Sequence, residues 1–190
     1  MTRITDTLAA IDQLHHQDPK KVDGVAAELI YAQQMTQWLQ KLVPDASEEL
    51  QIAVRSQHLC RWGIPRSDYP LGRTGYLQWR TELGKYHAQK ALEVMTAQGY
   101  SEDSCKVTST IIRKQGIKRN PDVQALEDCA CLVFLTQDFS SFAAKHDKKK
   151  IIAIVQKTWE KMSETAQAMA LELPFSEHEL SLLQEALSAD

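Results

Sequence analysis

Glycine and proline are scarce in this chain, with seven glycines and six prolines among 190 residues. They fall between segments in which apolar residues recur every three or four positions, as on one face of an α-helix. No segment shows the strict apolar and polar alternation of a half-buried strand, which argues against a β-rich architecture. We therefore predict an all-α fold, a single globular domain over residues 1–190 built as a bundle of about eight helices.

The sequence also lacks a strong charge excess and a long apolar run. A formal net charge of -3 gives no overall attraction to nucleic acid or to an anionic membrane, so any site for an anion must be local. The N-terminal residues have no long apolar run behind a basic start, so we expect neither a signal peptide nor a membrane span. These absences predict a cytoplasmic protein with no membrane partner.

Cysteine is scarce as well, and its spacing is not that of a metal site. The chain has four cysteines, Cys60, Cys105, Cys129 and Cys131. The last two lie inside an apolar run, and none belongs to a paired metal-binding pattern. We interpret all four as small buried hydrophobic residues.

What the chain does have is a concentration of arginine between Ala53 and Arg80. Five of its eight arginines lie there, and Asp68 is the one acidic residue of that stretch. The arginines are Arg55, Arg61, Arg66, Arg73 and Arg80, and the aromatic residues among them are Trp62, Tyr69, Tyr76 and Trp79. Because a guanidinium matches the planar geometry of phosphate and carboxylate, the stretch predicts a site for a small anionic or phosphorylated ligand. The alternative is that these arginines pair with distant acids or lie along the surface.

Helical periodicity predicts that polar residues face the interior from several helices. Glu28 begins the apolar stripe of a helix expected over residues 23–43. The next helix is expected to run from Asp45 to Trp62, which would place Arg55, His58 and Trp62 on one face. A carboxylate and an imidazole are therefore predicted to point toward the core.

Two further helices add polar residues to the predicted interior. In a helix expected over residues 76–98, Arg80 and His87 lie on the same inward stripe. A helix beginning at Pro121 is apolar on nearly every side after Asp128, so we expect it to be the central, most buried helix. Glu127 and Asp128 would be buried with it.

The segment from Gly63 to Gly75 is predicted to be an irregular loop. It contains two prolines and three glycines, and it carries two arginines and a tyrosine that would meet a ligand. We expect this loop to act as a mobile lid over the site.

Glu28, His58, His87 and Asp128 are predicted to converge on one buried point. Ionised carboxylates in a helical core are costly unless they are paired or bind a metal. Imidazole and carboxylate together are common ligands of zinc, manganese and iron, so we predict a divalent metal ion (Zn, Mn or Fe) there. The alternative is that the histidines are ordinary core residues and the carboxylates pair with nearby arginines.

Five segments of the chain resemble the uncharacterised family called domain of unknown function 4202. They are ELIYAQQMTQWL, AVRSQHLCRWGIPRSDYPLGRTGYLQWR, LEDCACLVFL, FAAKHDKKK and KTWEKMS. This resemblance spans almost the whole chain and implies no activity.

More remotely, two histidines on separate helices and an aspartate on a later buried helix are similar to the HD-domain superfamily of metal-dependent phosphohydrolases. The adjacent His-Asp pair of that superfamily is absent, since His58 is followed by Leu59 and His87 by Ala88. Glu28 fills the position of the first-helix histidine.

The HD-domain resemblance implies an HD-like hydrolase that acts on a small phosphorylated molecule or nucleotide. In such an enzyme a divalent ion lowers the pKa of a bound water, and the resulting hydroxide attacks the phosphorus centre. The implied metal ligands are His58, His87, Asp128 and Glu28, and the implied general base is Glu127 or Glu28. The implied substrate-binding residues are Arg55, Arg61, Arg66, Arg80, Trp62, Tyr69 and Tyr76.

A second hypothesis comes from a different class of protein. The chain is then a non-catalytic helical binding module that recognises an anionic ligand, a protein partner or RNA through its arginine and aromatic loop. The missing His-Asp pair favours the binding module, and the inward carboxylates and histidines favour the enzyme. Both hypotheses leave a homodimer open.

Overall fold

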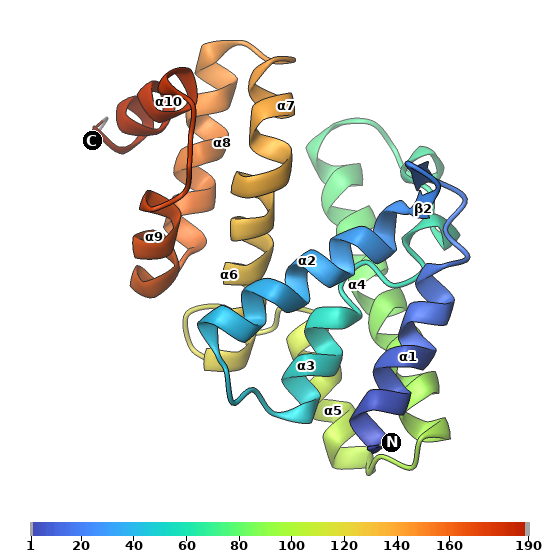
Figure 1. The fold of residues 1–190 in the computed structure, drawn as a ribbon. Coiled ribbons are helices and arrows are strands. Elements are labelled where there is room, and N and C mark those ends of the chain that lie inside the picture. Colours follow the sequence, from blue (N-terminus) through green and yellow to red (C-terminus); the bar gives the residue numbers. More distant parts are fainter. Residues whose placement is uncertain (1, 189–190) are drawn as a thin grey trace.

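The fold, seen in a computed structural model that describes residues 2–188, is built from helices (Figure 1). The described residues form ten α-helices and one two-stranded hairpin. The α-helices are α1 (Arg3–His15), α2 (Ala27–Leu42), α3 (Glu48–Arg55), α4 (Gly72–Ala97), α5 (Glu102–Ile112), α6 (Pro121–Val133), α7 (Phe139–Ala143), α8 (Lys148–Lys161), α9 (Glu164–Leu171) and α10 (Glu177–Ser188). The shorter elements are β1 (Lys21–Val22), β2 (Val25–Ala26), the 3-10 turns η1 (Arg61–Gly63) and η2 (Arg66–Asp68), and the π-helical turn η3 (Phe134–Asp138).

The predicted all-α class is confirmed, with ten α-helices in residues 2–188 where about eight were predicted. Helix α9 has a clear local signal, because the Ser163 hydroxyl accepts a hydrogen bond from the Ala166 amide. Across residues 2–188, none of the helices combines the length and apolar character needed to cross a membrane.

Helix α6 is shared by two hydrophobic cores, which confirms it as the central helix. Its residues Leu126 and Cys129 pack into a core formed with α1 to α5. Its residues Cys131 and Leu132 face a second core that α7 to α10 complete. Figure 1 shows α2 crossing α6 between these two groups of helices. All four cysteines are buried, as predicted, and burial raises the pKa of Cys129 and Cys131 to about 12.

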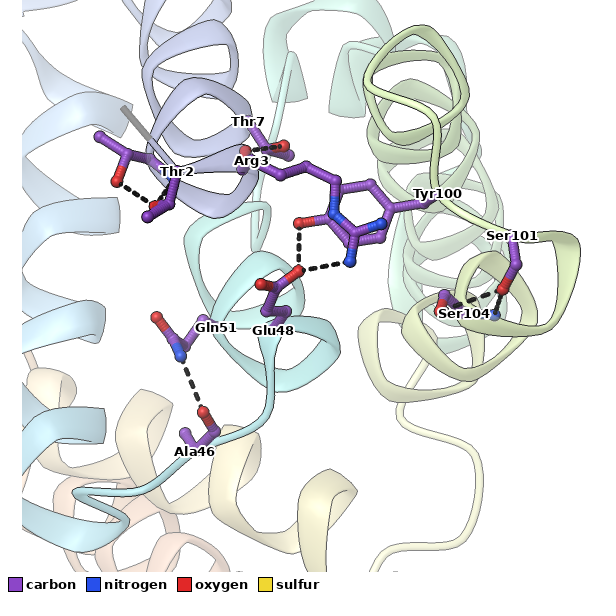
Figure 2. Close-up of polar contacts among 10 residues, drawn as sticks. Thr2, Arg3, Thr7, Ala46, Glu48, Gln51, Tyr100, Ser101 and Ser104 are labelled. Carbon is purple, nitrogen blue, oxygen red and sulfur yellow. Dashed lines mark hydrogen bonds and ion pairs between the residues drawn. The ribbon is translucent and has the colours of Figure 1, made fainter.

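The N-terminal helix is fastened to the first core by a polar contact between distant segments (Figure 2). Glu48, the first residue of α3, accepts hydrogen bonds on Oε2 from Arg3 at 3.0 Å and from the Tyr100 hydroxyl at 2.7 Å. The Arg3 guanidinium also lies over the Tyr100 ring, 4.0 Å from its centroid. This contact joins α1, α3 and the residue before the Ser101 cap of α5.

The helix predicted over residues 23–43 does not begin at Asp23, because residues 21–26 form a short hairpin. Asp23 and Gly24 have φ angles of 49° and 83°, both in the left-handed region. A two-residue hairpin turn needs that conformation, and an Asp-Gly pair favours it. Helix α2 therefore begins at Ala27, after the hairpin, and not at Asp23.

The helix predicted from Asp45 to Trp62 ends at Arg55. His58 and Cys60 have φ angles of 68° and 55°, and a right-handed helix cannot continue through residues in that region. Arg55, His58 and Trp62 therefore do not share one helix face. The turn redirects the chain after α3, and this places His58 against α2.

The predicted irregular loop from Gly63 to Gly75 is shorter and more ordered than expected, because α4 begins at Gly72. The Trp79 indole donates to the Ile64 carbonyl at 2.9 Å, which ties the segment to α4. The Arg66 guanidinium donates to the carbonyls of Tyr69 and Pro70 at 2.9 Å each. The mobile-lid prediction stays a prediction, and it now concerns a segment held by several hydrogen bonds.

Replacing Gly75 by alanine tests the packing of this segment on α4. An added Cβ at Gly75 would lie 2.0 Å from the Pro70 carbonyl oxygen, so the backbone would have to move. We expect Gly75→Ala to lower the free energy of unfolding by about 1–3 kcal/mol, as overpacking does. Urea unfolding followed by circular dichroism measures the change.

Gly84 is the matched control on the same helix. A Cβ at Gly84 would have its nearest neighbour at 3.9 Å. Gly84→Ala should therefore stabilise the protein by about 0.5–1 kcal/mol, the usual gain in a helix interior. Equal effects of the two substitutions would contradict the close approach at Gly75.

Candidate functional site

Polar side chains from four separate elements meet where α2 passes the turn after α3. Helix α2 supplies Glu28 and Tyr31, the turn supplies His58, η1 supplies Arg61 and α4 supplies His87. We call these five residues the His58 cluster. The His58 ring stacks on Tyr31 with centroids 4.4 Å apart, and the His87 ring lies 6.0 Å from it.

Hydrogen bonds fix the tautomer of His58. Arg61 Nη1 lies 2.8 Å from His58 Nε2, and because a guanidinium only donates, Nε2 must carry the lone pair. The proton is then on Nδ1, which donates to Glu28 Oε2 at 3.2 Å. His58 is therefore neutral and is held between a carboxylate and a guanidinium.

The electrostatics of the His58 cluster keep its imidazole neutral. Burial and then the charge of Arg61 lower the pKa of His58 well below its usual value. Burial raises the pKa of Glu28, and the Arg61 charge partly offsets that rise. Burial also raises the pKa of the Tyr31 hydroxyl.

His87 is oriented in the same way as His58. Its Nδ1 donates to the Leu59 carbonyl at 2.7 Å, so the lone pair is on Nε2. Its side chain is buried, and burial, followed by the neighbouring His58, lowers the pKa of His87 to about 3. Both histidines thus keep an unprotonated Nε2 at neutral pH.

The buried carboxylate of Glu127 pairs with two lysines, one of which also acts on the His58 cluster. Lys114, which follows α5, donates to Glu127 on α6 at 2.6 Å, and Lys161 at the end of α8 lies 3.5 Å from the same carboxylate. Burial opposes ionisation of Glu127, but the charge and hydrogen bond of Lys114 outweigh it and lower the pKa of that carboxyl. The charges of Lys114 and Arg80 also act on His58 and lower its pKa.

Arg61 is positioned by an aromatic face as well as by hydrogen bonds. Its guanidinium lies over the Trp79 ring, 5.0 Å from the centroid, and its Nε is 3.9 Å from Glu28 Oε1. Trp79 is itself held by its hydrogen bond to Ile64. Arg61 therefore has a defined direction toward His58, with the side chain about one-third exposed at 34%.

The prediction that Arg80 lies on the buried stripe of α4 is wrong. Arg80 is exposed, whereas Trp79, Leu83 and His87 form the buried stripe. Its guanidinium donates to the Tyr76 hydroxyl at 3.3 Å. Within residues 2–188, no carboxylate lies within ion-pair distance of Arg80.

Two predicted site residues have structural partners elsewhere. Arg55 forms a two-pronged ion pair with Asp12, with both N···O distances at 2.7 Å. Asp128 accepts hydrogen bonds on Oδ1 from the Gln124 amide and the Ser163 backbone, both at 2.8 Å. These contacts favour the structural alternative for both residues.

The remaining predicted residues lie around the arginine segment. Trp62 packs on the first core. Arg66 donates hydrogen bonds to the carbonyls of Tyr69 and Pro70. Tyr76 is 42% exposed, with its ring 6.0 Å from that of Trp79.

The four predicted metal ligands do not fit a metal site in this arrangement. Glu28 and His58 are in contact, but His58 Nε2 faces Arg61 and Asp128 bonds with Gln124 and Ser163. Among residues 2–188, no group of three or more His, Cys, Asp or Glu side chains is arranged to hold an ion. The structure joins Glu28, His58 and His87 with cations instead.

Two residues near the site were missed by the sequence analysis, and the role of a third was not recognised. Tyr31 stands three positions after Glu28, so the helical spacing that selected Glu28 also places Tyr31 nearby. Lys114 has a φ of 55°, and no local pattern indicated that it would fold toward Glu127. Trp79 was noted as an aromatic neighbour of the arginines, but its contact with Arg61 depends on the turn at residues 56–63.

The molecule is thus an all-α domain with a mixed polar cluster of histidine, carboxylate and cations. Residues 5–183 match the family described as a domain of unknown function, DUF4202, and the protein belongs to that family, as the sequence resemblance predicted. Neither the curated proteins nor the solved structures provide a match. The similarity to HD-domain phosphohydrolases stays a prediction from the sequence.

Removing Lys114 should expose the cost of burying Glu127. In Lys114→Met the carboxylate, which is 6% exposed, loses its closest cation, so the free energy of unfolding at pH 7 should fall by about 3–5 kcal/mol. Lys161→Met is the control, because Lys161 is half exposed and more distant, and its loss should cost about 0–1 kcal/mol.

The same pair of variants has a predicted pH dependence. The lowered pKa of Glu127 stabilises the wild-type fold above the unfolded carboxyl pKa, and that contribution is lost as pH falls through the folded value. Without Lys114 the pKa of the buried carboxyl rises, so acid protonates it and relieves the penalty. Denaturant unfolding should show a smaller deficit for Lys114→Met at about pH 4 than at about pH 7. A deficit independent of pH would contradict the assignment.

Proposed function

We propose that the protein binds a small phosphorylated ligand beside the His58 cluster. The observation that carries the proposal is that two guanidinium groups, Arg61 and Arg80, act electrostatically on His58, while neither donates a hydrogen bond to a carboxylate within residues 2–188. Lys114 adds a third cation, and the carboxylates that act on the cluster are Asp18, Glu28, Glu127 and Asp138. Both histidines are neutral, so the arginines and not the imidazoles supply the positive charge for an anion.

The state of each arginine supports an anion as the missing partner. Arg80 is exposed, has no carboxylate partner within residues 2–188, and acts electrostatically on both His58 and Glu127. Arg61 uses Nη1 on His58 and directs Nε toward Glu28 at 3.9 Å, so Nη2 is the donor group without a hydrogen-bond partner among residues 2–188. Two guanidinium groups, one oriented by Trp79 and one exposed beside Tyr76, suit the planar recognition of a phosphate.

This function does not require a reaction. Arg61 and Arg80 would donate to the phosphate, whereas the unprotonated Nε2 atoms of the histidines can only accept a hydrogen bond, and that of His58 would keep the Arg61 guanidinium in place. The proposal therefore favours the binding module among the two hypotheses from the sequence.

Isothermal titration calorimetry with inorganic phosphate and with phenyl phosphate tests the site. We expect Arg61→Met and Arg80→Met each to weaken binding by about 1.5–3 kcal/mol, because each removes a hydrogen bond to a charged group. Arg73→Met, an exposed arginine on the same helix as Arg80, is the control and should bind like wild type. Failure of wild type to bind either probe, or equal losses in all three variants, would contradict the proposal.

Thermal unfolding of the same variants separates a ligand role from a structural one. Arg80 has no carboxylate partner, so Arg80→Met should change the free energy of unfolding by no more than about 0.5 kcal/mol without ligand. Phosphate should raise the melting temperature of wild type more than that of the variant. A large loss of stability without ligand, together with no ligand-induced shift in wild type, argues for a structural role of Arg80.

Metal-dependent hydrolysis of a phosphorylated molecule is a second candidate, favoured by the orientation of the two histidines. Both direct Nδ1–H at an oxygen, Glu28 Oε2 or the Leu59 carbonyl, which is how proteins orient histidines that ligate metals through Nε2. Arg61 occupies the position in front of His58 Nε2, so an ion there requires Arg61 to move.

The metal content of the purified protein decides between the candidates. A near-stoichiometric zinc, manganese or iron ion that is lost in His87→Ala would support hydrolysis. Trace metal in wild type and variant alike, after growth in supplemented medium, would leave ligand binding as the remaining candidate function.

A further inference from the structure

A second surface lies at the start of α4, on the opposite side of that helix from its buried stripe. Leu71 is 95% exposed, Tyr76 42% and Leu77 52%. Arg73, Tyr76, Leu77 and Arg80 follow a spacing of three and four residues, so they share one helix face. We call this surface, from Leu71 to Arg80, the α4 patch.

The exposure of these residues is a property of an ordered surface. Gly75 packs directly on the Pro70 carbonyl, and Arg66 holds the carbonyls of Tyr69 and Pro70. Arg80 donates to the Tyr76 hydroxyl and lies near its ring, with 5.9 Å to the centroid. The chain thus presents two leucines and a tyrosine on a rigid support, which is typical of a recognition surface.

The charge of the α4 patch specifies the chemistry of its partner. Between Asp68 and Glu82 the chain has no acidic residue, while Arg73 and Arg80 contribute positive charge. The first turn of α4 contains no acid, and Leu71 at the N-cap offers no side-chain hydrogen bond, so the positive end of the helix is not neutralised. A complementary surface must therefore carry negative charge next to apolar side chains.

We propose that the α4 patch docks an acidic segment of a partner protein that also carries apolar side chains. Carboxylates of the segment pair with Arg73 and the amino end of α4, and its apolar side chains cover Leu71 and Leu77. A small phosphorylated ligand would not bury two exposed leucines, so this interaction goes beyond the function proposed above. The two surfaces adjoin at Arg80.

Photo-crosslinking tests the surface with the full chain in the cells that naturally make it. A benzophenone amino acid at position 77 should crosslink to protein segments with net negative charge and apolar residues, and Arg73→Glu should reduce the yield at least about tenfold. The same label at position 107 is the control, because Val107 on α5 is similarly exposed at 47%. Mass spectrometry identifies the crosslinked segments.

Every other result overturns the proposal. Such results are crosslinks to RNA, to a second copy of this chain or to basic segments, the same products from position 107, or no product at position 77.

Binding of a synthetic peptide with the sequence of the crosslinked segment separates the two surfaces. By fluorescence anisotropy, Arg73→Glu and Leu77→Glu should each weaken peptide binding at least about tenfold, and Arg61→Met should not change it. Phosphate binding should show the reverse pattern, with a loss only in Arg61→Met. Loss of peptide binding in Arg61→Met, or unchanged peptide binding in both patch variants, would overturn docking without bearing on the phosphate site.

Discussion

The left-handed turn at His58 and Cys60 is the constraint on which the polar cluster depends. An ordinary continuation of α3 would carry His58 along the helix axis, away from Glu28. Left-handed conformations cost a non-glycine residue of order 1 kcal/mol or more, and they persist where the surroundings hold them. Here the carboxylate of Glu28, the ring of Tyr31 and the guanidinium of Arg61 hold His58 from three sides. The contacts of the His58 cluster therefore stabilise the left-handed turn, and the turn itself places His58 in the cluster.

The arginines of the central stretch differ in role because their partners differ. Arg55 is satisfied by Asp12, and Arg66 by two backbone carbonyls, so both stabilise the fold. Arg61 is oriented by Trp79 and a neutral histidine, and Arg80 is exposed without a carboxylate partner among the described residues. Clustering in the sequence identified the stretch, but only the partner of each guanidinium distinguishes a structural arginine from one available to a ligand.

Local signals predicted most of the helices but not their interruptions. Asn120 before Pro121 correctly marked the start of α6, because an Asn cap and a proline in the first turn act within one turn. The apolar character of α6 likewise predicted its central place between two cores. The end of α3 was missed because no glycine or proline precedes His58, and the Asp23-Gly24 hairpin was missed although that pair is a known turn signal.

The sequence by itself determined the all-α class, the family, the burial of the cysteines and the inward direction of Glu28 and His87. Each depends on composition, on matching segments or on periodicity within one helix. Only the tertiary structure decided that Asp128 accepts a hydrogen bond from the Ser163 backbone, that Lys114 forms an ion pair with Glu127, and that Arg80 is exposed. Those outcomes depend on contacts between segments far apart in the chain and on the rotation of whole helices, and an offset of one residue in a helix turns a side chain by about 100°.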